Sequence, residues 1–109
     1  MPNTYKTLAQ SAPSATTLTT IYTTPASTQT ITSALIVANR STIATSFRSA
    51  IAIAGAADTL AQYLHYDAPI GANESIALVL GLSLQPTDQI RVYATLATLS
   101  FNIFGVEKT

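Results

Sequence analysis

The sequence contains no cysteine and no tryptophan, and His65 is its only histidine. Without cysteine the chain can form neither disulfides nor thiolate metal sites. A catalytic triad would have to use His65, and no serine stands in the Gly-x-Ser-x-Gly pattern of a nucleophile elbow. The four glycines are isolated and match neither nucleotide-binding fingerprint. We therefore expect no catalytic residues, no cofactor and no enzymatic activity.

Charge is also scarce, because charged residues make up only 9% of the chain, against about a quarter in ordinary soluble domains. The five basic and five acidic residues balance to a formal net charge of zero. The basic residues are scattered, which argues against phosphate contacts and so against nucleic-acid binding. A surface with so little charge is poorly protected against self-association. The composition therefore predicts a subunit of an assembly.

Long apolar runs are missing too. The longest, residues 76–84, is about half the length of a helix that spans a bilayer, so we expect no membrane partner. The first residues also lack the basic and apolar regions of a secretory signal.

His65 and Asp67 are two residues apart, so on a strand their side chains would share a face. Half of a metal site is geometrically possible there, but a usual site needs three or four converging ligands. We favour a polar pair on an exposed or intersubunit face, and we expect no metal.

The sequence does contain many short runs of β-branched and aromatic residues, each broken by Pro, Gly or Asn. Their spacing predicts about eight strands, the density of a two-sheet sandwich. The Cys…Trp…Cys signature of immunoglobulin domains is absent. We therefore predict an all-β protein with a single-domain antiparallel β-sandwich over residues 18–109. Its expected strand order is jelly-roll-like, in preference to an immunoglobulin-like Greek key.

Alternation within these runs predicts which side chains share a face of their strand. The expected sets are Ile31 with Leu35 and Val37, Phe47 with Ile51 and Ile53, Ile90 with Val92 and Ala94, and Phe101 with Ile103. Arg48 and the small residues that alternate with Phe47 are expected to point outward. Residues 60–66 fit both a helical and a strand spacing, and the aromatic residues and the following Pro69 favour a strand. Pro86 suits the second position of a type I turn, which Asp88 can cap.

Residues 1–17 are rich in Thr, Ser, Ala and Pro, with Tyr5 and Leu8 as the only sizeable apolar side chains. This composition predicts an extended N-terminal arm, either frayed or laid on a neighbour as an added strand. Because such an arm has little to bury within its own domain, we expect deletion of residues 1–14 to leave the fold intact and to weaken attachment to a neighbour.

The residues expected at an interface are Tyr5, Leu8, Tyr63, His65 and Tyr93. Aromatic side chains with a polar tip are favoured at interfaces. For the tyrosines, partial burial within the sandwich is the alternative interpretation.

Four motifs combine a strand with a turn. They are Tyr22-Thr-Thr-Pro-Ala-Ser-Thr28, Val37-Ala-Asn-Arg-Ser41, Tyr66-Asp-Ala-Pro-Ile-Gly-Ala-Asn73 and Gln89-Ile-Arg-Val-Tyr93. Together they resemble a group of small virion proteins of tailed bacteriophages, over about residues 18–106. The motifs are spacings of turns and strands, and no catalytic residues belong to them.

The resemblance implies a non-enzymatic subunit of a phage particle. The expected role is a capsid decoration (cement) protein that stabilises the head by contacting the major capsid protein or another virion protein. The resemblance also implies self-association, often as a trimer, and location in the virion after synthesis in the host cytoplasm. One alternative is a neck, tail or fibre-attachment subunit. A more distant alternative is a carbohydrate-binding module, for which tyrosines such as Tyr63 and Tyr93 would have to supply the aromatic platform.

Overall fold

The structure is a computed structural model that describes residues 3–79 and 81–109. Within these residues the chain forms nine β-strands and two short 3-10 helices. In chain order they are β1 (Asn3–Ser11), β2 (Thr19–Thr23), β3 (Gln29–Asn39), β4 (Thr45–Ala52), η1 (Ile53–Gly55), η2 (Leu60–Gln62), β5 (Tyr63–Ile70), β6 (Ser75–Leu78), β7 (Ser83–Leu84), β8 (Gln89–Ala94) and β9 (Leu99–Lys108). The predicted all-β class is confirmed.

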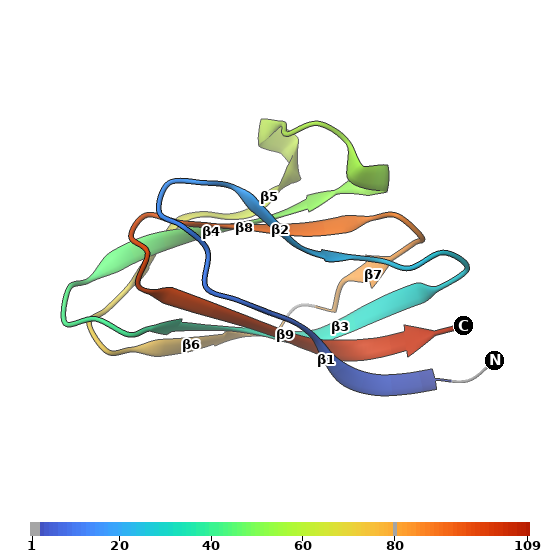
Figure 1. Ribbon diagram of the computed structural model, residues 1–109, viewed down its shortest axis with the longest axis horizontal. Helices are drawn as coiled ribbons and strands as arrows, with labels where there is room; N and C mark the ends of the chain where they lie inside the picture. Colours follow the sequence, from blue (N-terminus) through green and yellow to red (C-terminus); the bar gives the residue numbers. More distant parts are fainter. Residues whose placement is uncertain (1–2, 80) are drawn as a thin grey trace.

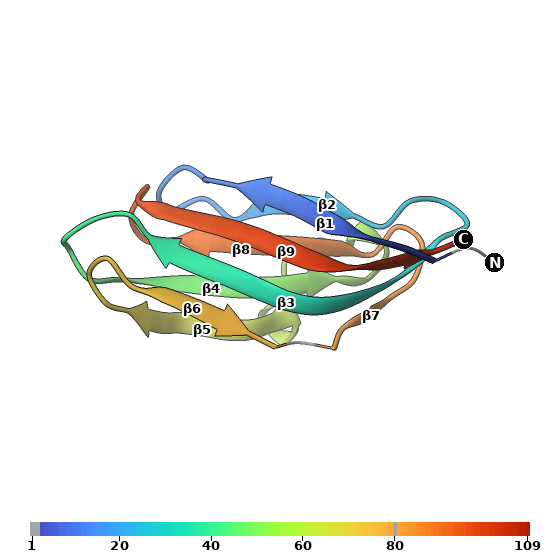
Figure 2. The same cartoon turned by 90° about the horizontal axis from the view of Figure 1, so that it is seen from below.

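The strands form two antiparallel sheets that pack face to face (Figures 1 and 2). Sheet I has the order β1-β9-β3-β6, with β7 also paired to β3, and sheet II has the order β2-β8-β4-β5. The pairing is nested, because β1 pairs with β9, β2 with β8, β3 with β6 and β4 with β5. A long hairpin of such nested strand pairs that is rolled up into two packed sheets is a jelly roll. The jelly-roll-like strand order is therefore confirmed.

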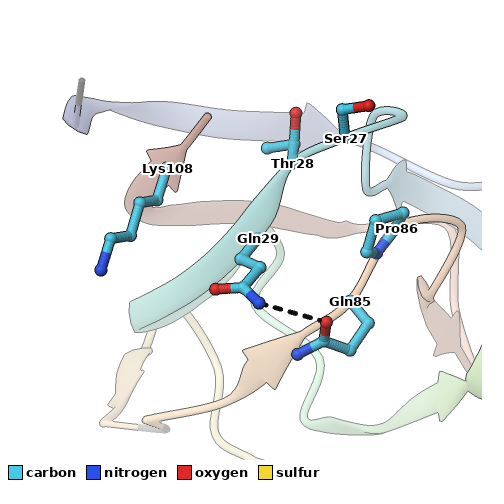
Figure 3. A pocket seen from close by; sticks show the side chains of 6 residues that line it. All are labelled: Ser27, Thr28, Gln29, Gln85, Pro86 and Lys108. Atoms are coloured by element: carbon cyan, nitrogen blue, oxygen red, sulfur yellow. Dashed lines mark hydrogen bonds between the residues drawn. The ribbon is translucent and has the colours of Figure 1, made fainter. Parts of the chain in front are cut away.

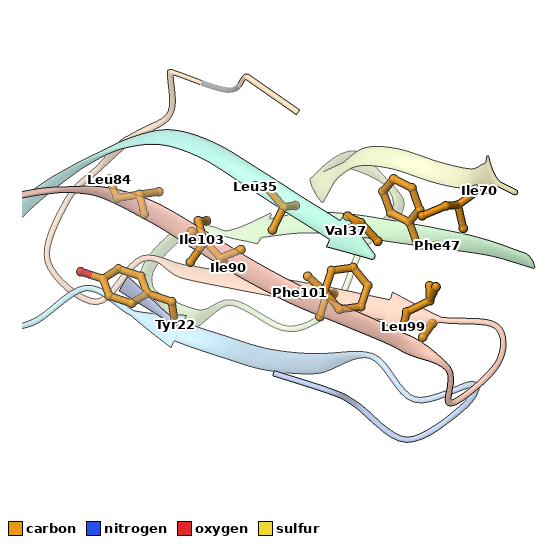
Figure 4. Close-up of a cluster of buried hydrophobic side chains, with 12 residues drawn as sticks. Tyr22, Leu35, Val37, Phe47, Ile70, Leu84, Ile90, Leu99, Phe101 and Ile103 are labelled. Atoms are coloured by element: carbon orange, nitrogen blue, oxygen red, sulfur yellow. The ribbon is translucent and has the colours of Figure 1, made fainter. Parts of the chain in front are cut away.

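The core lies between the sheets and contains aliphatic and aromatic side chains from both (Figure 4). The Phe47 ring of sheet II meets the Phe101 ring of sheet I edge-on, with 6.2 Å between the ring centroids. Every second residue is buried along β8 and from Leu99 to Gly105 in β9. That is the pattern of strands with one face on the core, and it confirms the faces predicted for these two strands.

Strand β3 departs from the predicted alternation because it contains a β-bulge. Its register against β9 shifts between Thr32 and Ala34, so Ser33 is an extra residue. Before the shift the buried residue nearest the bulge is Thr32, and after it the buried residues continue at Leu35. The predicted placement of Ile31 on the face of Leu35 is therefore wrong, and the Ile31 side chain is 51% exposed.

The segment 53–62 also departs from the prediction. Strand β4 ends at Ala52 and η1 carries Ile53 away from the core, so Ile53 does not share the face of Phe47 and is 73% exposed. Residues 60–62 form η2, and the predicted strand begins only at Tyr63. The segment stands above the outer face of sheet II (Figure 1), where Arg91 of β8 binds its Asp58 carboxylate.

The N-terminal segment is extended, as expected, and it belongs to the sandwich. Residues 3–11 form β1, which pairs with β9 along its length at the edge of sheet I. Leu8 packs against the core, and Lys6 forms an ion pair with Glu107 of β9 with an N–O distance of 3.0 Å. The sheet therefore begins at residue 3 instead of residue 18, because β9 offers a full edge of backbone hydrogen-bonding groups to the arm.

A turn over residues 85–88 joins β7 to β8 at the predicted position. The Asp88 backbone N–H donates to the Gln85 carbonyl oxygen at 3.1 Å. Thr87 has a φ of 72°, which belongs to the third position of a type II turn and corrects the predicted type I. The buried Asp88 carboxylate accepts hydrogen bonds from the backbone N–H groups of Gln85 and Ala54, both at 2.9 Å, and so ties the turn to η1.

Candidate interaction surfaces

The outer face of sheet I carries almost no charge. Its outward-facing side chains, read from the strand register, include Tyr5, Thr7, Ile31, Ala34, Ile36, Ala77, Asn102, Phe104 and Val106. Within the described strands of sheet I the only charged residue on this face is Lys108, at the very end of β9, and Arg40 follows β3 at the opposite end of the face. We call this surface the uncharged face; Figure 2 looks onto its strands.

The apolar side chains of the uncharged face stand next to one another across the strands. Tyr5, Val106 and Ile31 are aligned in one row over β1, β9 and β3, and Phe104 lies in the next row beside Ala34. Tyr5 is 72% exposed and Ile31 is 51% exposed, so the described part of the chain leaves them open to solvent. Contiguous apolar patches of this kind mark interaction sites in soluble proteins.

The outer face of sheet II carries three tyrosines around one arginine. The guanidinium carbon of Arg48 lies 4.0 Å from the centroid of the Tyr66 ring, 4.3 Å from that of Tyr93 and 5.9 Å from that of Tyr63. The Tyr63 and Tyr66 rings meet edge-on at 5.0 Å. Asp67 accepts two hydrogen bonds from Arg48, at 2.7 and 3.3 Å. We call these five residues the Arg48 cluster.

A second β-bulge, in β5, builds this cluster. In the register of β4 and β5, the single residue Arg48 stands opposite both Tyr66 and Asp67. The backbone takes up the extra residue at Asp67, whose φ is 52°. Both Tyr66 and Asp67 therefore reach the side of the sheet where Arg48 lies. Asp67 raises the pKa of the Arg48 guanidinium, mainly through these hydrogen bonds, so the Arg48 side chain stays charged.

His65 lies apart from the cluster because the bulge separates it from Asp67. Its Nδ1 atom is 2.7 Å from the Ser49 hydroxyl, and its ring centroid is 5.9 Å from that of Phe47. The predicted polar pair of His65 with Asp67 is therefore wrong, since Asp67 pairs with Arg48. No group of three or more potential metal ligands occurs among the residues that the structure describes.

The structure distributes the five predicted interface residues over three places. Tyr5 lies on the uncharged face, Tyr63 and Tyr93 belong to the Arg48 cluster, and Leu8 and His65 pack beside core residues. The sequence interpretation missed the roles of Arg48 and Tyr66 as neighbours of the two tyrosines. The alternation in β4 did place Arg48 outward, but nothing in the pattern of β5 marks the bulge.

A polar network joins four strands at one end of the core. The Tyr22 hydroxyl donates to the Glu107 carboxylate at 2.6 Å and lies 2.8 Å from the Thr30 hydroxyl, while Lys6 donates to the other Glu107 oxygen. Burial and the hydrogen bond with Glu107 raise the pKa of Tyr22 to about 12. The Tyr22 hydrogen bond and Lys6 lower the pKa of Glu107. These shifts follow from structural contacts within the fold.

Two open hollows lie on the surface, one at the Lys108 end of the uncharged face and the other beside the segment 53–62. One, of about 290 Å³, is lined by Ser27, Thr28, Gln29, Gln85, Pro86 and Lys108 (Figure 3), and the Gln29 amide donates to Gln85 at 3.3 Å. The other, of about 190 Å³, is lined by Asp58, Thr59, Leu60 and Tyr63. The second hollow adjoins the Arg48 cluster through Tyr63. Neither lining brings a nucleophile together with a histidine base.

No helix in the described part of the chain is long and apolar enough to cross a membrane. Comparison of the chain with models of known protein families, with curated proteins and with solved structures yields no match.

Proposed function

We propose that this protein is a non-enzymatic structural subunit of a bacteriophage particle. Its proposed role is that of a capsid decoration protein, which stabilises the head through contacts with other virion proteins. The strand-and-turn motifs that resemble phage virion proteins support this role. So does a jelly roll in which one broad sheet face carries charge only at its ends.

The uncharged face is the observation that carries the proposal. Burying apolar surface in a protein contact gains roughly 25 cal/mol per Å², whereas burying an unpaired charge costs several kcal/mol. A face that contains Tyr5, Ile31 and Phe104 and no charge before Lys108 obtains the gain without the cost. Such a surface is suited to permanent contact with a protein neighbour.

Cryo-electron microscopy of phage particles that carry this protein tests the role. Density repeated over the icosahedral head lattice is the expected result, with the uncharged face buried in a contact. Density confined to the portal vertex or the tail would replace the decoration role with that of a neck, tail or fibre-attachment subunit. Particles without any such density would contradict a virion role altogether.

Carbohydrate binding is a second candidate function, and the Arg48 cluster is the observation that favours it. Tyr66 is 54% exposed, and the cluster adjoins the hollow whose lining supplies the Asp58 carboxylate and the Thr59 hydroxyl. An aromatic ring beside polar groups is a suitable arrangement for a sugar, which presents both an apolar face and hydroxyls.

A glycan array separates this candidate from the first. If the Arg48 cluster binds sugars, Tyr66→Ala should abolish retention of a glycan by the purified protein. Tyr5→Ala is the matched control, since Tyr5 is an even more exposed tyrosine on the opposite sheet. Absence of any glycan signal from the unmodified protein would exclude this function.

A further inference from the structure

We propose that the uncharged face is covered by a second copy of this chain, packed face to face about a two-fold axis. The inference rests on the proposed function, because it names the first neighbour that the subunit meets in an assembly. Three properties of the described residues support it: the charge of the face, its size, and the state of the sheet edges.

Charge favours pairing of this face with itself. In a two-fold contact each patch meets its own copy, so any charge near the axis meets a like charge. The strands of the uncharged face contain no such charge before Lys108, and Arg40 lies beyond their other end, so both charges are far from the centre of the face. The outer face of sheet II differs, because Arg48 and Arg91 both lie there on adjacent strands. Self-pairing through sheet II would have to bury the Arg48–Asp67 and Arg91–Asp58 ion pairs at the cost of their hydration, whereas self-pairing through sheet I brings together neutral rows.

The uncharged face is also large enough. Strands β1, β9, β3 and β6 contribute 9, 10, 11 and 4 residues. At about 3.3 Å per residue and about 4.8 Å between strands they cover roughly 540 Å² as a flat sheet. Two copies packed over this face would bury roughly 1,100 Å² in total, which exceeds the value of about 1,000 Å² that a specific interface should reach. The row of Tyr5, Val106 and Ile31 crosses three strands and so provides an apolar centre for the contact.

The sheet edges are poorly suited to the alternative, in which copies associate by adding strands. β1 and β2 each contain a β-bulge, β5 contains a bulge and Pro69, and β6 is only four residues long. Bulges, prolines and short strands are the features by which natural sheets prevent edge-to-edge pairing. Association is therefore directed to a face, and segment 53–62 already covers part of the other face.

Sedimentation equilibrium of the full chain tests this inference with a matched pair of variants. We expect the unmodified protein to be dimeric and Ile31→Lys to weaken the dimer by more than about tenfold, because the two lysines would face each other. Ile53→Lys is the control, since Ile53 is more exposed than Ile31 and lies in the segment above sheet II. The Ile53→Lys variant should form a dimer with the same dissociation constant as the unmodified protein. Tyr5→Lys repeats the test from a second strand, in case Ile31→Lys impairs folding, which circular dichroism would reveal.

Several results would overturn the inference. They are a monomer or a trimer for the unmodified protein, a dimer that survives both Ile31→Lys and Tyr5→Lys, and a dimer that Ile53→Lys disrupts equally. Failure of this inference and failure of the proposed function give different results. A monomer that still decorates heads contradicts only the inference, whereas a dimer that never appears in particles contradicts only the virion role.

Discussion

At the scale of single residues, Tyr22 is a polar group that the fold holds in place by several contacts. Its side chain is only 8% exposed, and its hydroxyl bonds the Glu107 carboxylate and contacts Thr30. Hydrogen bonds to a charged group contribute about 1.5–3 kcal/mol. We therefore expect Tyr22→Phe to lower the free energy of unfolding at neutral pH by about that amount, measured by urea denaturation. Tyr5→Phe is the control, because Tyr5 is largely exposed.

The same contact makes stability depend on alkaline pH. The folded-state pKa of Tyr22 is raised from 10.0 to about 12, so the folded state favours the neutral phenol. The stabilisation that the folded state gains from the neutral Tyr22 phenol is fully present below pH 10 and is lost as the pH rises through 12. The unfolding free energy of the unmodified protein should fall across this window more steeply than that of Tyr22→Phe. Identical profiles for the two proteins would show that this tyrosine does not couple stability to pH.

At the scale of elements, the turn after β7 owes its shape to Asp88. Its carboxylate accepts the backbone N–H groups of Gln85 and Ala54, so one side chain joins a turn to η1. Asp88→Ala leaves both donors without this partner, and we expect a loss of about 2–4 kcal/mol in unfolding free energy. Asp88→Asn keeps one acceptor oxygen and should lose less. If the two variants unfold at the same urea concentration as the unmodified protein, the carboxylate does not hold the turn.

The strands also show where an alternating sequence pattern predicts the buried face and where it fails. The alternation of Ile90 with Arg91 and of Phe101 with Asn102 correctly predicted which face of β8 and of β9 is buried. Neither strand has an extra residue along the part that packs on the core. The same rule failed at Ile31, where one extra residue reverses the two faces of a strand. A bulge is set by pairing with a strand distant in sequence, so a local pattern does not contain it.

The same limit applies to the candidate surfaces. Tyr63 and Tyr93 were expected at an interface from their residue type alone, and both do lie on an outer face. Their association with Arg48 depends on the bulge in β5 and on the order of β8, β4 and β5 in sheet II. The uncharged face likewise requires strands from both ends of the chain to lie side by side. Composition predicted that such a surface exists, and topology decides where it is.

At the scale of the whole molecule, β1 closes the roll, because it brings the N-terminal residues onto the last strand. Removing residues 1–11 would leave the β9 edge unpaired, take Leu8 from the side of the core and break the Lys6–Glu107 ion pair. We therefore expect the truncated protein to melt well below the unmodified one in a circular dichroism scan, and to aggregate through the newly exposed edge. A frayed arm would give unchanged melting temperatures. Thr4→Ala is the control within the full chain: Thr4 is exposed, its register opposite Glu107 places it off the uncharged face, and the variant keeps the backbone pairing of β1, so it should melt like the unmodified protein.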